Sequence, residues 1–142
     1  MIIVTQEIEK YFRESGWEPG RLNSAYINKQ PACNIFADAI FKEFGGLNIG
    51  SCSPGKQMAA GNIYFFSSPI STKTLVTSRW EEQLGLLTPV ADAHNDHIII
   101  YVSESGDFYF YTDPDEKLYF GGQSFNEAMC KLLLGHSFGK EI

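Results

Sequence analysis

The sequence predicts an α+β domain in which helices pack on one side of an antiparallel sheet. Three observations lead to this class. Apolar residues recur at helical spacing in three stretches before residue 85, short apolar runs alternate with turn residues between positions 97 and 120, and a helix-capping sequence follows the last run. Hairpin-connected strands that end in a helix are typical of a sheet with its helices segregated to one face. The length of 142 residues suits a single domain, residues 1–142.

The helices expected before the sheet are bounded by capping and breaking residues. Thr5 begins the first and Ser71 the third, while Pro31 opens the second, where a missing N–H is tolerated. Glycines end all of them. The helices are expected at residues 5–15, 31–44 and 71–84, and short extended segments at residues 25–27, 47–49 and 62–66.

The clearest architecture is a three-stranded antiparallel meander in the C-terminal half. Residues 97–102 are nearly all apolar, which predicts a strand covered on both faces. Turns at residues 104–107 and 113–116 separate it from two further strands, at residues 108–112 and 118–120.

Two further signals frame this meander. Pro89 begins an extended run that leads into it. After it, Ser124 and Glu127 have the spacing of a capping box, which predicts a final helix that Gly135 ends.

Acidic charge is concentrated in the second half of the chain. The 17 acidic and 11 basic residues give a net charge of −6, and nine of the acids lie between Trp80 and Glu116, a stretch without Lys or Arg. A field of one sign attracts a basic partner and repels nucleic acid and anionic membranes. A solvated acidic surface that serves only solubility is the alternative interpretation.

The meander brings several of these acids together. Because its strands alternate in direction, the loop before it, with Asp92 and Asp96, lies at the same end as the turn at residues 113–116. Acids on loops are available for contact. The candidate partner-binding residues are Asp92, Asp96, Asp113, Asp115 and Glu116, with Glu81 and Glu82 as a second patch. Exposed aromatic residues, Tyr111 or Tyr119, would be the expected anchors.

Other binding chemistries have little support in the sequence. The chain has no basic patch for nucleic acid, and no apolar stretch approaches the roughly 18 residues of a membrane span. The N-terminus lacks the pattern of a signal peptide. Cys33, Cys52 and Cys130 are odd in number and in no Cys-x-x-Cys spacing, which is typical of a reducing cytoplasm. We therefore expect a cytoplasmic protein.

One cluster has the residue types of a metal site. His94, Asp96 and His97 lie in one loop, so a small metal-dependent hydrolase is the alternative from another functional class. Their spacing is not that of two His residues one helical turn apart, and Asp, Asn and His are also ordinary loop residues. We expect no catalytic residue, no bound metal and no cofactor.

A glycine-rich motif follows the first helix. It reads Gly-Trp-Glu-Pro-Gly-Arg at residues 16–21. Gly16 and Gly20 supply turn conformations, Trp17 closes the end of the core, and Arg21 ties the turn to a carboxylate or to backbone carbonyls. We expect these roles to be structural.

Further motifs follow in a fixed order. The first is Phe-Gly-Gly-Leu at residues 44–47, which contains Gly45 and Gly46. Leu-Gly at residues 84–85 and Pro-Val at residues 89–90 come next, before Ser-Gly-Asp-Phe-Tyr at residues 105–109. The last are Gly-Gly-Gln-Ser-Phe-Asn-Glu-Ala at residues 121–128 and Leu-Leu-Leu-Gly at residues 132–135. The ordered set resembles the SUKH superfamily, in the subgroup with a Gly-Trp-x-x-Gly-Arg opening, over residues 5–135.

The resemblance implies an α+β domain without catalysis. Members of this superfamily are typically immunity proteins that bind the toxic domain of a bacterial toxin encoded beside them, and these toxins are often nucleases or nucleic-acid deaminases. The expected partner is therefore a cognate toxin, basic in charge, and the expected state is a monomer or a weak homodimer paired through an exposed strand edge. A regulatory interaction domain of the same superfamily, without a toxin partner, is the remaining alternative.

Overall fold

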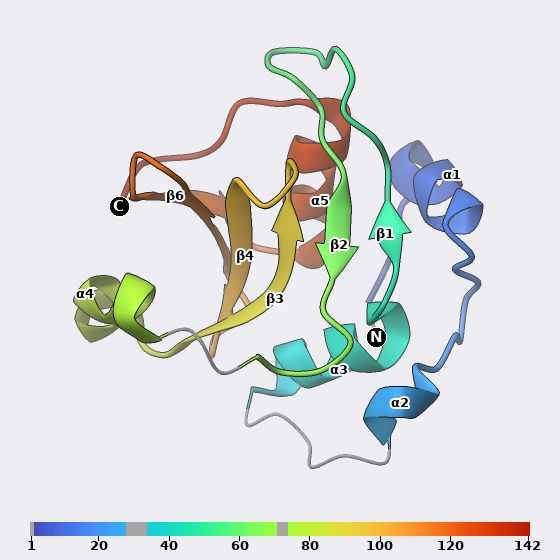
Figure 1. The fold of residues 1–142 in the computed structure, drawn as a ribbon, viewed down its shortest axis with the longest axis horizontal. Helices are drawn as coiled ribbons and strands as arrows, with labels where there is room; N and C mark the ends of the chain where they lie inside the picture. The colour runs from blue at the N-terminus through green and yellow to red at the C-terminus, as the bar shows by residue number, and fades with distance from the viewer. Residues whose placement is uncertain (1, 28–33, 71–73) are drawn as a thin grey trace.

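The strands form one antiparallel sheet in chain order. The computed structural model describes residues 2–27, 34–70 and 74–142. In these residues a six-stranded sheet has the order β1-β2-β3-β4-β5-β6, so the predicted meander extends over the whole sheet (Figure 1). The strands are β1 Asn48–Ile49, β2 Ile63–Phe65, β3 Leu87–Ala93, β4 Ile98–Ser103, β5 Phe108–Thr112 and β6 Lys117–Gly122. The predicted α+β class is confirmed.

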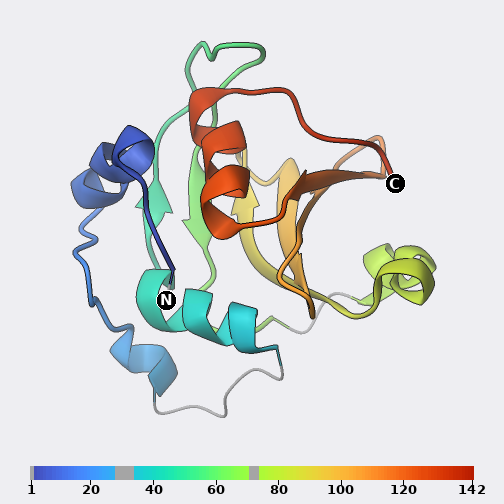
Figure 2. The same cartoon turned by 180° about the vertical axis from the view of Figure 1, so that it is seen from behind.

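Helices cover both faces of the sheet, although unequally. They are α1 Gln6–Glu14, α2 Ser24–Ile27, α3 Ile35–Phe44, α4 Thr74–Leu84 and α5 Phe125–Leu134. The elements α1, α3 and α5 share one core with the sheet (Figure 2), whereas α4 stands on the opposite face. The sequence predicted helices on one side only. The difference arises because Tyr101, Tyr109 and Tyr111 make the second face apolar, and Trp80 of α4 packs on it.

Strand β4 shows why both faces are covered. Ile98, Ile100 and Val102 point into the main core, while Ile99 and Tyr101 alternate with them and belong to the second cluster. A side-chain period of two residues assigns neighbours to opposite faces. The continuous apolar run therefore predicted a doubly covered strand correctly, and β4 lies fourth in the sheet, with a partner on each side.

The main core is organised around aromatic rings at the end of α3. Phe44 is fully buried, with its ring centroid 4.8 Å from that of Phe125, 5.3 Å from Phe12 and 5.5 Å from Phe65. Trp17 stacks on Phe44 at 6.2 Å. These rings come from α1, α3, α5, β2 and the glycine-rich turn, so one cluster joins elements that are far apart in the chain.

The glycine-rich turn is fastened to the C-terminal end of α3. Trp17 is 5% exposed, and its Nε1 donates a hydrogen bond to Glu43 Oε2 at 2.9 Å. The Arg21 guanidinium donates from Nη1 to the carbonyl oxygen of Glu43 at 2.8 Å and from Nη2 to that of Gly45 at 3.2 Å. Because the last carbonyls of a helix lack intrahelical partners, a fork of donors satisfies them well.

Two expected elements differ from the prediction. The segment expected to be extended at residues 25–27 is the short helix α2, in which Tyr26 N–H donates to the Asn23 carbonyl at 3.1 Å. Tyr26 is buried against Phe41, with ring centroids 5.4 Å apart, so packing on α3 outweighs the β propensity of the segment. Thr5 occupies the cap position of α1, but its hydroxyl donates to Asn126 Oδ1 at 2.8 Å instead of capping.

The starts of two other helices fall partly outside the described residues. Pro31 and Ser71 belong to that undescribed part. In the described part, α3 begins after Asn34, whose Oδ1 accepts hydrogen bonds from the backbone N–H groups of Phe36 and Ala37 at 2.8 and 3.1 Å. Asn is a preferred N-cap residue because its side chain satisfies these donors.

The outer edge of β6 is covered by the C-terminal segment. Gly139 N–H donates to the Phe120 carbonyl, Phe120 N–H to the Lys140 carbonyl, and Ile142 N–H to the Leu118 carbonyl, at 2.8–2.9 Å. The other edge strand, β1, has two residues. Short or covered edges discourage pairing between copies of a sheet.

Candidate partner-binding surface

Two turns meet at one end of the sheet. The first joins β3 to β4 through residues 94–97, and the second joins β5 to β6 through residues 113–116. Ile98 pairs with Thr112, and the Asp113 N–H donates to the His97 carbonyl at 2.9 Å. The turns are therefore adjacent and directly hydrogen-bonded.

Four of the candidate acids lie on these two turns. Asp96 belongs to the first turn and Asp113, Asp115 and Glu116 to the second, and all four are exposed. Thr112 Oγ1 donates to Asp115 Oδ1 at 2.5 Å, which orients that carboxylate. We call these four residues the acidic turn surface.

The backbone of the first turn has an unusual conformation. His94, Asn95 and Asp96 have φ values of 52°, 55° and 73°, in the left-handed region that Asn and Asp tolerate better than other non-glycine residues. Asn62 holds the turn, since its carbonyl accepts from His94 N–H at 3.0 Å and its Oδ1 from Asn95 N–H at 3.2 Å. Such conformations cluster at binding sites because the surrounding structure must stabilise them.

Asp92 is not on the preceding loop, as the sequence suggested, but within β3. It is half-buried and pairs across the sheet with Tyr64 on β2 and Ile99 on β4. Burial of the carboxylate, together with a hydrogen bond to Asp96 and repulsion from it, raises the pKa of Asp92 to about 6. Asp92 is thus mostly neutral below about pH 6.

Replacing Asp92 by Asn is expected to raise the free energy of unfolding at pH 7 by about 1 kcal/mol. The folded-state pKa of about 6 exceeds the ordinary value of 3.8, so the stabilisation from protonated Asp92 is present below pH 3.8 and is lost as the pH rises through 6. Solvent screens a half-buried group, which keeps the effect small.

Urea unfolding of the wild type and of Asp92→Asn at about pH 4 and pH 7 tests this difference. The advantage of the Asn variant should appear at pH 7 and vanish at pH 4. Glu18→Gln, at an exposed acid, serves as the control and should show no such difference. An Asn advantage of equal size at both pH values would contradict the raised pKa.

Helix α4 brings a base to the acidic turn surface. The Arg79 guanidinium donates a hydrogen bond from Nη2 to the backbone carbonyl of Glu116, and it lies over the Trp80 ring at 4.1 Å. Arg79 was not among the predicted residues because it lies just before the base-free stretch and 37 positions from Glu116. Arg79 partly offsets the acidic field at that end.

The second patch is divided between two environments. Glu81 is half-buried, and its Oε2 accepts a hydrogen bond from Leu87 N–H at 3.0 Å, which ties the end of α4 to the start of β3. Glu82 is exposed on α4. Glu82 therefore remains available for contact, whereas Glu81 has a structural partner.

The two aromatic residues expected as anchors are not prominent on the surface. Tyr111 is 5% exposed, with its ring 5.9 Å from that of Trp80, so the expectation of an exposed anchor is wrong for it. Burial and the neighbouring Glu116 and Asp113 raise the pKa of its phenol. Tyr119 is half-buried against Phe138. Side chains in β5 point alternately to the two faces of the sheet. Tyr111 points to the second face, and α4 covers that face, so Tyr111 is buried.

The His-containing turn has no arrangement of metal ligands. His94 is half-buried, and its ring lies so close to Gly61 that a Cβ there would be 2.5 Å from it. Burial and the nearby His97 lower the pKa of His94. Among the described residues, no group of three or more His, Cys, Asp or Glu side chains is placed to hold a metal ion.

The comparisons with known proteins agree with the motifs. The family model described as SUKH-3 immunity protein matches residues 4–135, almost the whole chain, which confirms the resemblance to the SUKH superfamily. Neither a curated protein nor a solved structure gives a match. In the described part of the chain, the helices are too short or too polar to cross a membrane. The chain therefore belongs to the SUKH-3 immunity protein family, and this membership supports an immunity function, implies a toxin as partner and suggests a role without catalysis.

Proposed function

We propose that this protein neutralises a cognate bacterial toxin by binding its toxic domain and occluding the active site with the acidic turn surface. One observation carries the proposal. Two adjacent turns, joined by the hydrogen bond from Asp113 to His97, present four exposed carboxylates. None of the four forms an ion pair with a Lys or Arg side chain that the structure describes, so their charge is available to a partner.

The chemistry of this surface suits a basic active site. A nuclease or a nucleic-acid deaminase attracts phosphates with Lys and Arg residues, and carboxylates compete for the same cations. Backbone hydrogen bonds fix the two turns before binding and Thr112 orients the Asp115 carboxylate, which reduces the entropy lost on association. A one-signed field also raises the encounter rate. Occlusion of this kind needs no chemical step in the immunity protein.

A stoichiometric titration tests this function. Increasing amounts of the purified protein are added to a fixed concentration of the toxin encoded by the neighbouring gene, and the toxin's activity is measured. Because tight binders block one active site each, activity should fall linearly and vanish near equimolar protein. Protein that has been treated with a chelator and dialysed should give the same endpoint.

Three results would overturn the proposal. Full toxin activity at about tenfold excess of protein would show that the toxin is not bound at working affinity. Complete inactivation by a small fraction of an equivalent would show turnover, which occlusion cannot produce. Loss of inhibition after chelation would likewise indicate metal-dependent chemistry.

A further inference from the structure

An apolar groove lies at the other end of the sheet from the acidic turn surface. Its walls come from the N-terminal segment, α3, the turn between β4 and β5, and the start of α5, and they enclose about 590 Å³. Ile35 and Ile3 at the groove are 74% and 67% exposed, and Phe36 is 38% exposed. Contiguous exposed apolar side chains in a concave site are typical of a binding surface.

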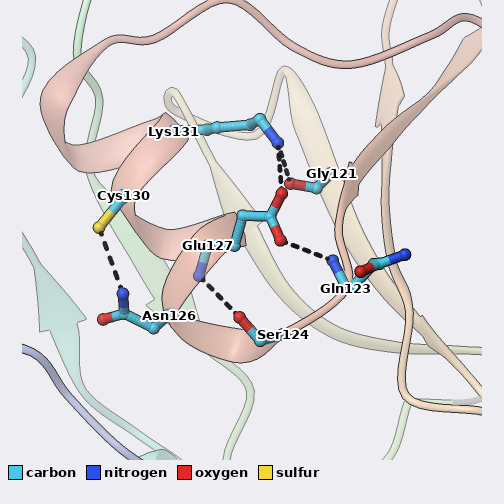
Figure 3. A network of polar contacts seen from close by, with 7 residues as sticks. All are labelled: Gly121, Gln123, Ser124, Asn126, Glu127, Cys130 and Lys131. Carbon is cyan, nitrogen blue, oxygen red and sulfur yellow. Dashed lines mark hydrogen bonds and ion pairs between the residues drawn. The ribbon is translucent and has the colours of Figure 1, made fainter.

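The wall formed by α5 is held rigidly by a polar network. Figure 3 shows Ser124 Oγ accepting from Glu127 N–H at 3.1 Å, and Glu127 Oε2 accepting from Gln123 N–H at 3.0 Å. Lys131 Nζ lies 3.5 Å from Glu127 Oε1 and donates to the Gly121 carbonyl at 2.8 Å. Ser124 therefore caps α5, while Glu127 binds the N–H of Gln123, one residue before the cap, and is braced by an ion pair with Lys131.

The remaining walls are fixed by close contacts. Thr5 donates from its N–H and its hydroxyl to Asn126 Oδ1 at 3.0 and 2.8 Å, which fastens the N-terminal segment to α5. Phe36 packs over Gly106, where a Cβ would lie 2.9 Å from the ring and where φ is +91°. The groove is thus preformed, and binding to it orders few groups.

The chain segments that line the groove carry more acids than bases. The charged residues within two positions of the lining residues are Glu7, Asp38, Glu104, Asp107, Glu127 and Lys42. Three of the acids, Glu7, Asp38 and Glu127, form ion pairs with lysines. Glu104 and Asp107, on the turn between β4 and β5 that forms one wall, have no ion pair with a residue that the structure describes. An apolar cavity beside two such acids complements an apolar side chain that has Lys or Arg residues beside it.

We propose that the groove receives an apolar side chain of the toxin, presented on a surface that carries basic residues. This inference rests on the proposed function and adds a second contact to it. The groove and the acidic turn surface are separated by the length of β4, roughly 20 Å for its six residues, so a toxin that contacts both extends along the side of the domain. The separation also lets substitutions at one surface leave the other intact.

The double variant Ile3→Gln/Ile35→Gln tests the groove. Both side chains are mostly exposed, so the fold should be preserved, and an unchanged urea midpoint verifies this. We expect the toxin Kd to rise about thirtyfold or more, mainly through faster dissociation, because a central apolar anchor is lost. The rise should persist at about 1 M salt, where charge effects are screened.

The matched control is Leu86→Gln, which removes an apolar side chain that is 61% exposed and outside the groove. Its Kd should stay within about twofold of the wild-type value. If wild-type protein binds the toxin and the double variant has an unchanged Kd, the toxin contact in the groove is overturned and the proposed function still stands. Wild-type protein that fails to bind the toxin overturns the proposed function itself.

Sedimentation of the protein alone tests whether the groove binds a second copy of the chain instead of the toxin. Wild-type protein and the double variant should both sediment as the same species. A wild-type dimer that becomes a monomer in Ile3→Gln/Ile35→Gln would assign the groove to a second copy of the chain and overturn the toxin contact.

Discussion

Phe44→Ala is expected to lower the free energy of unfolding by about 4 kcal/mol, close to half the stability of an ordinary domain. Phe44 is fully buried, and its ring lies within 4.8–6.2 Å of four other aromatic rings. These neighbours belong to α1, α5, β2 and the glycine-rich turn, so they cannot all move inward to fill the space. The cavity therefore adds to the lost transfer energy.

Urea unfolding at constant pH measures this loss. Leu86→Ala is the control, because Leu86 is 61% exposed and should contribute about 0.5 kcal/mol or less. A loss below about 1 kcal/mol for Phe44→Ala would contradict this account, because it would mean that the neighbouring rings move inward and fill the space.

Gly45→Ala is expected to lower the free energy of unfolding by about 3 kcal/mol, although it adds one methyl group. Gly45 has φ −53°, which any residue adopts, so backbone strain is not the reason. A Cβ there would lie 2.6 Å from the Phe41 carbonyl oxygen and 3.1 Å from that of Phe66. Both are backbone atoms, of α3 and of the chain just after β2, so helix and sheet must separate.

The same methyl group would displace Asn23. Asn23 Nδ2 would lie 2.4 Å from the added Cβ. In the wild-type protein this Nδ2 donates to the carbonyls of Phe41 and Ser67 at 3.1 and 2.9 Å. Loss of buried hydrogen bonds adds to the steric effect.

Gly20→Ala is the control: φ is +84°, but no atom lies within 4 Å, so only about 1 kcal/mol of strain is expected. Equal losses for the two variants would contradict the steric explanation.

The strands of the C-terminal half were predictable because their signal is local. Residues 97–102, 108–112 and 118–120 alternate with turn residues, and each run corresponds to a strand of the sheet. Residues 25–27 have strand-forming types, yet Tyr26 packs on Phe41 of α3. That contact depends on the tertiary fold, about which the strand propensity of the three residues carries no information.

The acidic turn surface was largely predictable for a geometric reason. Consecutive antiparallel strands alternate in direction, so the turns at residues 94–97 and 113–116 had to share one end. The side-chain contacts around these turns were harder to predict from the sequence. Burial of Tyr111 requires α4 on the second face, and the contact of Arg79 with Glu116 joins segments 37 positions apart.

The apolar groove left no signal in the sequence that periodicity or motif spacing could detect. Its lining residues come from four short segments of the chain, and no one segment is unusually apolar. Ile35 and Phe36 fit the expected helical stripe of α3, where they would have been assigned to the core. Both side chains are instead exposed.

In the proposed function, carboxylates on the two turns guide and hold a basic toxin. The most direct measurement is the association rate of toxin with Asp113→Lys/Asp115→Lys, compared with Glu14→Lys/Glu18→Lys, which makes the same change in net charge at exposed acids elsewhere. At about 0.01 M salt the turn variant should associate about tenfold more slowly than the control, and the difference should vanish at about 1 M salt, where the Debye length is about 3 Å. Equal association rates for the two variants at low salt would contradict the claim.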